Sequence, residues 1–407
     1  MDEALLKFIQ ENRNDDVLKL ALRGAPTTDF DMTFALDQIS GWQRARAKLP
    51  TWSAIKDIIY PPHLPIEQCS SEATARYKAE LCRRLIGGTP SPDTAFADLT
   101  GGLGVDFSFL ARLFGHAYYI EQDAYLCECA RNNLPLLGLG AAEVIEADCA
   151  DVLEELPHLR LLFIDPARRD NHGARMYNMN ECTPDLTHLL PLLLEKADFV
   201  VAKLSPMLDW HNTLVSFEDI RAGALKEIHL VAVGNECKEQ IVVLSSAPSD
   251  GPIPLHCANN DSCFVTDCET ERRPPRPALV DDLEEAISAT WLYEPNAAIM
   301  SAGCFGTLMQ NYPFKGLSAN SHLFVGDQYR PDFPGRVMRI QAVCNLSKRQ
   351  TRQVLEGIEQ ANITVRNFPM SAEVLRRRLH LEDGGDHYIF GSTVKNRKHM
   401  LFVCTKP

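Results

Sequence analysis

The residues that most clearly suggest chemistry form a glycine-rich turn directly after an apolar segment. They are Asp98, Thr100, Gly101, Gly102 and Gly104, within the run DLTGGLGVD. Glycines let a backbone turn sharply and approach a ligand closely. In a doubly wound sheet, nucleotides bind at such a turn between the first strand and its helix. A dinucleotide site requires G-x-G-x-x-G, but Phe107 stands at the third glycine, so a dinucleotide is disfavoured.

Two more acids follow apolar runs farther along the chain. Glu121 comes about twenty residues after the turn, where a carboxylate can accept both hydroxyls of a ribose. Asp148 ends the next run and can accept the amino group of adenine. Each acid alone could be a helix cap or a solvated charge, but three at successive strand ends indicate an adenosyl ligand. Asp98 suits a cationic amino group, so we expect S-adenosylmethionine as the cofactor.

The fourth apolar run ends in Asp165, Pro166, Ala167, Arg168 and Arg169. A proline after Asp165 stiffens the turn and directs nearby carbonyls into the cleft. D/N-P-P-aromatic turns are typical of N-methyltransferases, but Ala167 and Arg168 replace the second proline and the aromatic residue, which argues against amine methylation. Arginines suit phosphate as planar bidentate donors, although a surface ion-pair network would also explain them. We expect Asp165, Pro166 and Arg168 to be catalytic, Asp165 also to contact the cofactor, and Arg168 and Arg169 to contact substrate.

Methyl transfer from a sulfonium needs positioning rather than a covalent nucleophile, because the methyl group is already activated. Carbon-5 methylation of a pyrimidine is an exception, since it requires a thiolate. The fifth apolar run, VVAKLSPMLD, contains no cysteine, so that chemistry is not expected. Lys203 and Ser205 in this run lie at the mouth of the expected cleft, where they either contact substrate or cap the loop.

The elements that would position these residues read as an α/β fold. Residues 1–72 have helical periodicity, and in 73–247 short apolar runs alternate with amphipathic stretches, which predicts a parallel Rossmann-like sheet. Within it, residues 228–246 read as two strands around a Gly-Asn turn, a terminal hairpin. Residues 248–334 are expected to form a small accessory insert. The predicted strands are 95–100, 117–122, 143–148, 159–165 and 198–204.

Residues 335–407 predict a small α+β module of ferredoxin-like type, because strand and helix patterns follow the order β-α-β-α-β-β. The module holds thirteen Lys/Arg and six Asp/Glu, a net charge of +7, whereas the whole chain carries −13. Such asymmetry suggests a basic module on an acidic body. Its cations could follow a phosphate backbone, although a solvated helix face would look the same. They are Arg376, Arg377, Arg378, Lys395, Arg397 and Lys398.

Composition narrows the remaining classes. The 13 cysteines include no C-x-x-C pair, so we expect reduced thiols and no metal. The acidic N-terminus lacks the basic and apolar regions of a signal peptide, and no apolar run approaches the roughly 20 residues of a membrane span. We therefore expect a soluble, cytoplasmic protein without a membrane partner. The sequence does not indicate an oligomeric state.

These motifs resemble the predicted class I S-adenosylmethionine-dependent methyltransferases that carry a C-terminal THUMP-like domain. The resemblance covers most of the chain and is carried by YPPHLPIEQCSSEATARYKAEL (60–81), DLTGGLGVD, ARNN, DPARR, VAKLSPMLD and the basic module. It implies an RNA substrate, tRNA or rRNA, because THUMP domains deliver RNA to modification enzymes. Relative to the D-x-G-x-G-x-G form, Thr100 stands at the first glycine, which related RNA methyltransferases tolerate.

The segment EQCSSE before the sheet is expected to fold over the cofactor cleft, with Gln68 or a serine hydroxyl near the methionine end. Ordinary helix capping by Ser70 is the alternative. Two other functions stay open: a catalytically degenerate RNA-binding protein, and a small-molecule methyltransferase whose tail serves dimerisation.

Overall fold

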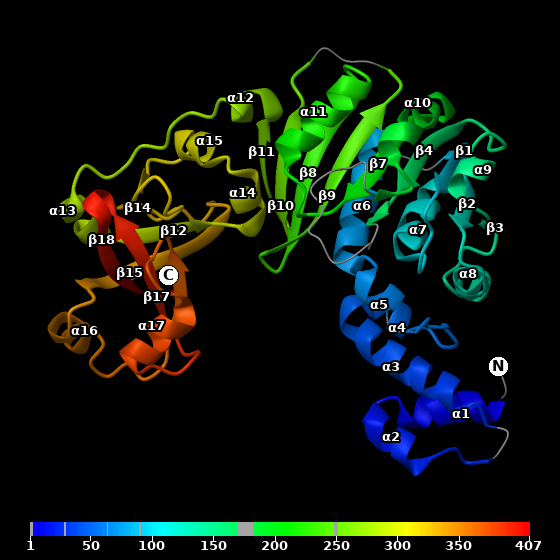
Figure 1. Ribbon diagram of the computed structural model, residues 1–407, viewed down its shortest axis with the longest axis horizontal. Coiled ribbons are helices and arrows are strands. Elements are labelled where there is room, and N and C mark those ends of the chain that lie inside the picture. Colours follow the sequence, from blue (N-terminus) through cyan, green and yellow to red (C-terminus); the bar gives the residue numbers. More distant parts are fainter. Residues whose placement is uncertain (1–2, 28–29, 63, 89–90, 169–181, 248–250) are drawn as a thin grey trace. The chain divides into compact units, whose positions relative to one another are not determined.

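The computed structural model is shown in Figure 1. It describes residues 3–27, 30–62, 64–88, 91–168, 182–247 and 251–407. Two compact units emerge from the contacts between residues: the first comprises 1–228 and 238–251, and the second comprises 229–237 and 252–407. Among the described residues, no helix is both long and apolar enough to cross a membrane.

The first unit begins with a series of helices. They are α1 (Glu3–Asn12), α2 (Val17–Arg23), α3 (Met32–Lys48), α4 (Pro50–Ser53), α5 (Leu64–Gln68) and α6 (Glu72–Leu85). Helix α6 starts at Ser71, whose hydroxyl accepts from the Thr74 N–H at 3.2 Å, as N-caps do. The buried side chains of Trp52 and Ile66 share one core cluster with Leu103 of the turn. Helices α4 and α5 therefore pack against the glycine-rich turn.

The strands of the first unit form the predicted Rossmann-like sheet. In chain order they are β1 (Ser91–Asp98), β2 (Phe114–Glu121), β3 (Glu143–Glu146), β4 (Leu159–Ile164), β7 (Ala197–Leu204), β8 (Leu225–Val233) and β9 (Glu236–Ser245). Their order across the sheet is β8-β9-β7-β4-β1-β2-β3. The pairs β1/β2, β1/β4, β2/β3 and β4/β7 are parallel, and β7/β9 is antiparallel. The terminal hairpin is thus confirmed as well, and its tip, residues 229–237, groups with the second unit.

Helices connect these strands, as parallel pairing requires. They are α7 (Val105–Leu110), α8 (Ala124–Leu136), α9 (Cys149–Val152), α10 (Leu186–Lys196) and α11 (Trp210–Ile220), with a 3-10 turn at Ala111–Leu113. A two-stranded piece pairs β5 (Ala167–Arg168) with β6 (Cys182–Thr183). Strand β4 is almost entirely buried, which explains its continuous apolar sequence.

The second unit contains a hairpin and a mixed sheet in the order β13-β14-β12-β15-β18-β17-β16. Its strands are β10 (Pro254–Asn259), β11 (Ser262–Asp267), β12 (Trp291–Pro295), β13 (Lys315–Gly316), β14 (Phe324–Gly326), β15 (Gly335–Asn345), β16 (Asn362–Arg366), β17 (His387–Val394) and β18 (Lys398–Thr405). Its helices are α12 (Cys268–Arg272), α13 (Leu283–Ser288), α14 (Ala297–Ala302), α15 (Phe305–Gln310), α16 (Lys348–Val354) and α17 (Ala372–Leu379), with a 3-10 turn at Lys395–Arg397.

The order β15-α16-β16-α17-β17-β18 reproduces the predicted β-α-β-α-β-β module. However, the sheet crosses the predicted boundary at residue 335, because β12 pairs with β15 from Trp291↔Arg339 to Pro295↔Gly335. Leu292 of β12 and Phe402 of β18 also share one buried cluster. The segment assigned to an accessory insert therefore supplies strands and core to the same sheet.

Candidate active site

A cavity of about 480 Å³ opens in the first unit where β1, β2, β3 and β4 end. Ligand sites of open α/β sheets lie at this carboxyl edge, and the volume falls within the usual range of small-molecule pockets. The lining includes every residue predicted to bind the cofactor. These are Gln68, Asp98, Thr100, Gly101, Gly102, Gly104, Glu121, Asp148 and Asp165.

The glycine-rich turn is shaped by backbone geometry and by close packing. Gly102 and Gly104 have φ values of +54° and +84°, a region that residues with a Cβ rarely adopt. Gly101 is required for another reason, since a Cβ there would lie 2.3 Å from the buried ring of Tyr119. The Tyr119 hydroxyl also donates to the Gly102 carbonyl. The turn is therefore held close against β2.

Asp98 is a buried acid facing other acids. It is 1% exposed, and its described hydrogen-bond donors are the N–H and hydroxyl of Thr100, at 3.0 and 3.4 Å. Burial raises the pKa of Asp98 well above its ordinary value. The hydrogen bond from the Thr100 N–H lowers this pKa, whereas the nearby carboxylates raise it further; they belong to Asp106, Asp165 and Glu121. A cation bound beside Asp98 would offset this cost.

Glu121 and Asp148 present carboxylates along the same cavity. The Glu121 oxygens accept the Gly102 N–H at 2.8 Å and the Asp123 N–H at 2.9 Å. Asp148 caps α9 by accepting the Ala150 N–H at 2.9 Å. Helix capping was the structural alternative considered for this acid. Because a carboxylate oxygen has two lone pairs, both acids can still accept from a hydroxyl or an amino group.

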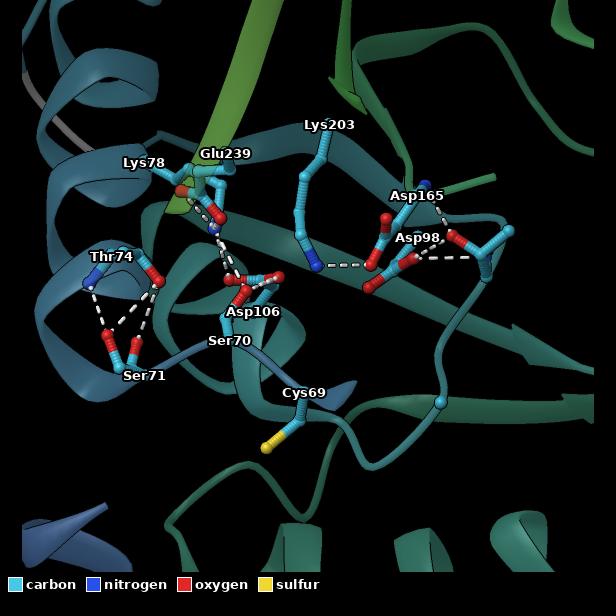
Figure 2. Close-up of polar contacts among 12 residues, drawn as sticks. Cys69, Ser70, Ser71, Thr74, Lys78, Asp98, Asp106, Asp165, Lys203 and Glu239 are labelled. Atoms are coloured by element: carbon cyan, nitrogen blue, oxygen red, sulfur yellow. Dashed lines mark hydrogen bonds and ion pairs between the residues drawn. The ribbon is translucent and has the colours of Figure 1, made fainter. Parts of the chain in front are cut away.

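The turn after β4 is held by two contacts to its first residue. The Asp165 N–H donates to Thr100 Oγ1 at 2.7 Å, and its carboxylate is ion-paired with Lys203 (Figure 2). Lys203 was predicted to contact substrate or to cap the loop, whereas its ammonium group is engaged with this acid. Pro166 is half-buried beside the cavity. The Arg168 side chain and all of Arg169 lie outside the described residues.

A buried ion network next to the cavity was not predicted from the sequence. The Lys78 ammonium lies 2.7 Å from both oxygens of Glu239, 3.0 Å from Ser70 Oγ and 3.1 Å from Asp106 Oδ1. Ser70 in turn donates to Asp106 Oδ2 at 2.7 Å (Figure 2). The network links EQCSSE, α6, α7 and β9. Ser70 is thus bound to α7, while Ser71 caps α6.

One signal in the sequence could have identified Lys78. It lies three residues after Ala75 and three before Leu81, on the face of α6 that is buried. A lysine at this spacing is fully buried only if it is paired. Its main partner, Glu239, lies 161 residues away in the chain, so no local pattern reveals the pair.

The predicted RNA contacts of the second unit lie on two elements. Arg376, Arg377 and Arg378 occupy the last turn of α17, whereas Lys395 and Arg397 lie in the exposed turn between β17 and β18. Arg376 is ion-paired with an aspartate, and Arg378 donates to a carbonyl at 3.3 Å. The Arg377 side chain is 72% exposed with a carboxylate at 3.9 Å, whereas that of Arg376 is 26% exposed.

Comparisons with known proteins agree with this architecture. Family models match a ferredoxin-like domain at residues 291–334 and a THUMP domain-like family at 335–406. A Porphyromonas gingivalis W83 crystal structure, described as a methyltransferase, is 30% identical, with a TM-score of 0.84, and the alignment covers 100% of this chain and 99% of that one. Uncharacterized S-adenosylmethionine-dependent methyltransferases of two Mycobacterium tuberculosis strains are 26% identical over 321 residues, 78% of this chain and 79% of theirs.

Three observations indicate the same family: the structural relative that matches over the full length, the THUMP-like match and the order of strands in the sheet. They also agree with the position of the cavity at the carboxyl edge of the sheet. The chain therefore belongs to the class I S-adenosylmethionine-dependent methyltransferase family that carries a C-terminal THUMP-like domain.

Proposed function

We propose that the chain binds S-adenosylmethionine in the cavity of its first unit and transfers the methyl group to RNA, a tRNA or an rRNA. The observation that carries the cofactor site is the set of strand-end acids Asp98, Glu121 and Asp148 on one cavity wall. Asp98 would receive the ammonium group, Glu121 the ribose hydroxyls and Asp148 the adenine amino group. The cofactor supplies an electrophilic methyl carbon on its sulfonium.

The RNA part of the proposal rests on the second unit. Its THUMP-like segment carries the chain's basic excess, a net +7 over residues 335–407, and Arg377, Lys395 and Arg397 are exposed. Cations of this kind bind phosphates irrespective of sequence. A double-stranded or folded RNA would be recognised mainly by shape and backbone.

The cofactor proposal is tested by calorimetric titration of the full chain with S-adenosylmethionine and with its demethylated product. Binding of both is expected. A chain that binds RNA but neither ligand would instead be a degenerate methyltransferase.

The substrate proposal is tested by incubating the chain, labelled S-adenosylmethionine and RNA from cells that lack this protein. Nucleoside mass spectrometry should then find a methylated nucleoside that appears only with active protein. Transfer to small molecules with no transfer to RNA would contradict it.

A further inference from the structure

The proposed function does not yet assign a role to the ion pair between Lys203 and Asp165. Strands β4 and β7 are parallel neighbours, and Ile164 pairs with Ala202. The next residue on each strand is therefore brought to the same point of the sheet edge. There the Lys203 side chain is 13% exposed and that of Asp165 is 36% exposed. Asp165 lines the cavity, and Lys203 of β7 directs its ammonium group at the Asp165 carboxylate from the side (Figure 2).

Three other acids in this part of the first unit already have partners among the described residues. Lys78 is shared by Glu239 and Asp106, and Asp98 accepts from the Thr100 N–H. Lys203 is thus left to pair with Asp165. Lys203 stays protonated in this position. Burial lowers the pKa of Lys203, but the surrounding carboxylates, above all that of Asp165, have the larger effect and raise the pKa overall.

Among the residues that the structure describes, the Asp165 carboxylate is held through one of its two oxygens. Its backbone N–H is held by Thr100 Oγ1, and Lys203 donates to Oδ2. Within the described part of the chain, these side-chain contacts fall on Oδ2, which leaves Oδ1 to accept from a ligand in the cavity. A carboxylate positioned in this way is a hydrogen-bond acceptor and a base, within reach of whatever occupies the cavity.

We propose that Asp165 accepts the proton of the methyl acceptor, and that Lys203 is the positioning residue that balances the charge of this carboxylate and holds it in place. The inference rests on the proposed methyl transfer and names its acceptor class: a heteroatom that carries hydrogen, such as an exocyclic amine, a ring N–H or a ribose hydroxyl. The bond from acceptor to methyl carbon forms while the carbon–sulfur bond breaks, its electron pair stays on sulfur, and the acceptor's proton moves to Asp165 Oδ1.

The variants that test this are D165N, K203M, K203R and the double variant D165N/K203M, with Lys19→Met on the exposed face of α2 as the control. Single-turnover methyl transfer to unmodified RNA is measured at saturating S-adenosylmethionine, together with the melting temperature. D165N should slow transfer by about 100-fold or more, the usual contribution of a general base. K203R should stay within about tenfold of the wild type, because it keeps the charge.

The double variant distinguishes the proton-accepting role of Asp165 from the charge-balancing role of Lys203. K203M should lower both the rate and the melting temperature, because it leaves a carboxylate unpaired among other acids. D165N/K203M should recover the melting temperature, since no unpaired charge remains, but not the rate. Recovery of both would mean that the pair is only structural and would overturn the proposal.

Product analysis provides an independent readout. A methyl group on an exocyclic amine, a ring nitrogen that carried hydrogen, or a ribose oxygen supports the inference. Its position also shows which of these three groups is the methyl acceptor. A methyl group on carbon, or on a ring nitrogen without hydrogen, overturns it. Wild-type chain that methylates no RNA overturns both this inference and the proposed function. Wild-type transfer with D165N within about threefold of it overturns this inference alone.

Discussion

At the scale of single residues, the cost of burying the charged form of Asp98 is the reason to expect a cation in the cavity. The acid is surrounded by other carboxylates and hydrogen-bonded to neutral groups. A bound ammonium group would convert this unfavourable environment into a buried ion pair. Replacing the acid by its neutral isostere separates the contribution to binding from the contribution to folding.

The D98N substitution should weaken binding of S-adenosylmethionine by roughly 30- to 1000-fold, the range expected when one partner of a buried charge pair is lost. Calorimetric titration measures it. Asp123→Asn, on the exposed surface after β2, is the control and should bind normally. Unchanged affinity in D98N would remove the ammonium contact from the proposal.

The same residue predicts a pH dependence of stability. Because the pKa of Asp98 is raised in the fold, the folded chain binds more protons than the unfolded one between the unfolded value, about 3.9, and the raised value. The free energy of unfolding therefore decreases as the pH rises through this window. Ligand-free D98N should lack this component and be the more stable protein above it. Denaturant titrations of both proteins across the pH range test this expectation, which fails if their profiles are parallel.

Gly101 tests the packing of the turn. A Cβ there would come within 2.3–2.7 Å of three atoms of the Tyr119 ring, and overpacking of this kind costs about 1–3 kcal/mol. G101A should lower the melting temperature and displace the Gly102 N–H from Glu121, weakening cofactor binding. Gly140→Ala is a matched control, because its Cβ would meet its nearest atom at 3.8 Å. Equal melting temperatures for the two variants would contradict the expectation.

At the scale of elements, the Lys78 network adds buried ion pairs between α6 and two other elements of the first unit. A single ammonium group connects α6 to α7 through Asp106, and to β9 through Glu239. Burial raises the pKa of the Glu239 carboxyl, and the Lys78 ammonium opposes this increase only in part. Ser70 brings EQCSSE into the same network and places Gln68 and Cys69 at the cavity wall.

Removing the charge of Lys78 should therefore destabilise the first unit. K78M leaves Glu239 buried and unpaired, a change that typically costs about 3–5 kcal/mol. The double variant K78M/E239M should recover most of this loss. Arg83→Met on the exposed side of the same helix, where the pair with Glu80 spans 3.6 Å, should cost less than about 1 kcal/mol. Chemical denaturation gives the values, and a K78M loss no larger than that of R83M would refute the network's role.

At the scale of the whole molecule, the charge is divided between an acidic body and a basic C-terminal segment. An acidic body repels RNA, so the basic segment must dominate encounter if RNA is the substrate. The Arg377 side chain is 72% exposed, while Arg376 is already paired with Asp383. The accessible charge is thus smaller than the sequence run suggests.

R377A should weaken RNA binding and reduce the slope of log affinity against log salt by about one. Arg330→Ala in the same unit is the control, since Arg330 is paired with Asp332 at 2.8 Å and lies outside the basic segment. Fluorescence anisotropy with folded RNA over a range of salt concentrations measures both. A salt slope identical to that of the wild type would exclude Arg377 as a phosphate contact.

The sequence by itself determined the order of the elements and the lining of the cavity. Parallel β-α units place each strand end at one edge of the sheet, so acids that follow successive strands must converge there. For this reason the sequence alone was enough to assign Asp98, Glu121 and Asp148 to one cavity. The C-terminal β-α-β-α-β-β order was readable for a similar reason, because its periodicities are local.

Only the tertiary structure decided which charges pair. Lys203 meets Asp165 through the register of two strands, and Lys78 meets Glu239 across 161 residues. The sharing of one sheet by β12 and β15 is likewise a long-range pairing. Local patterns report periodicity and strand ends, whereas a buried ion pair depends on side-chain reach between elements that are distant in the chain. That distance is why the acids that line the cavity could be predicted, whereas the ion-pair partners of Lys78 and Lys203 could not.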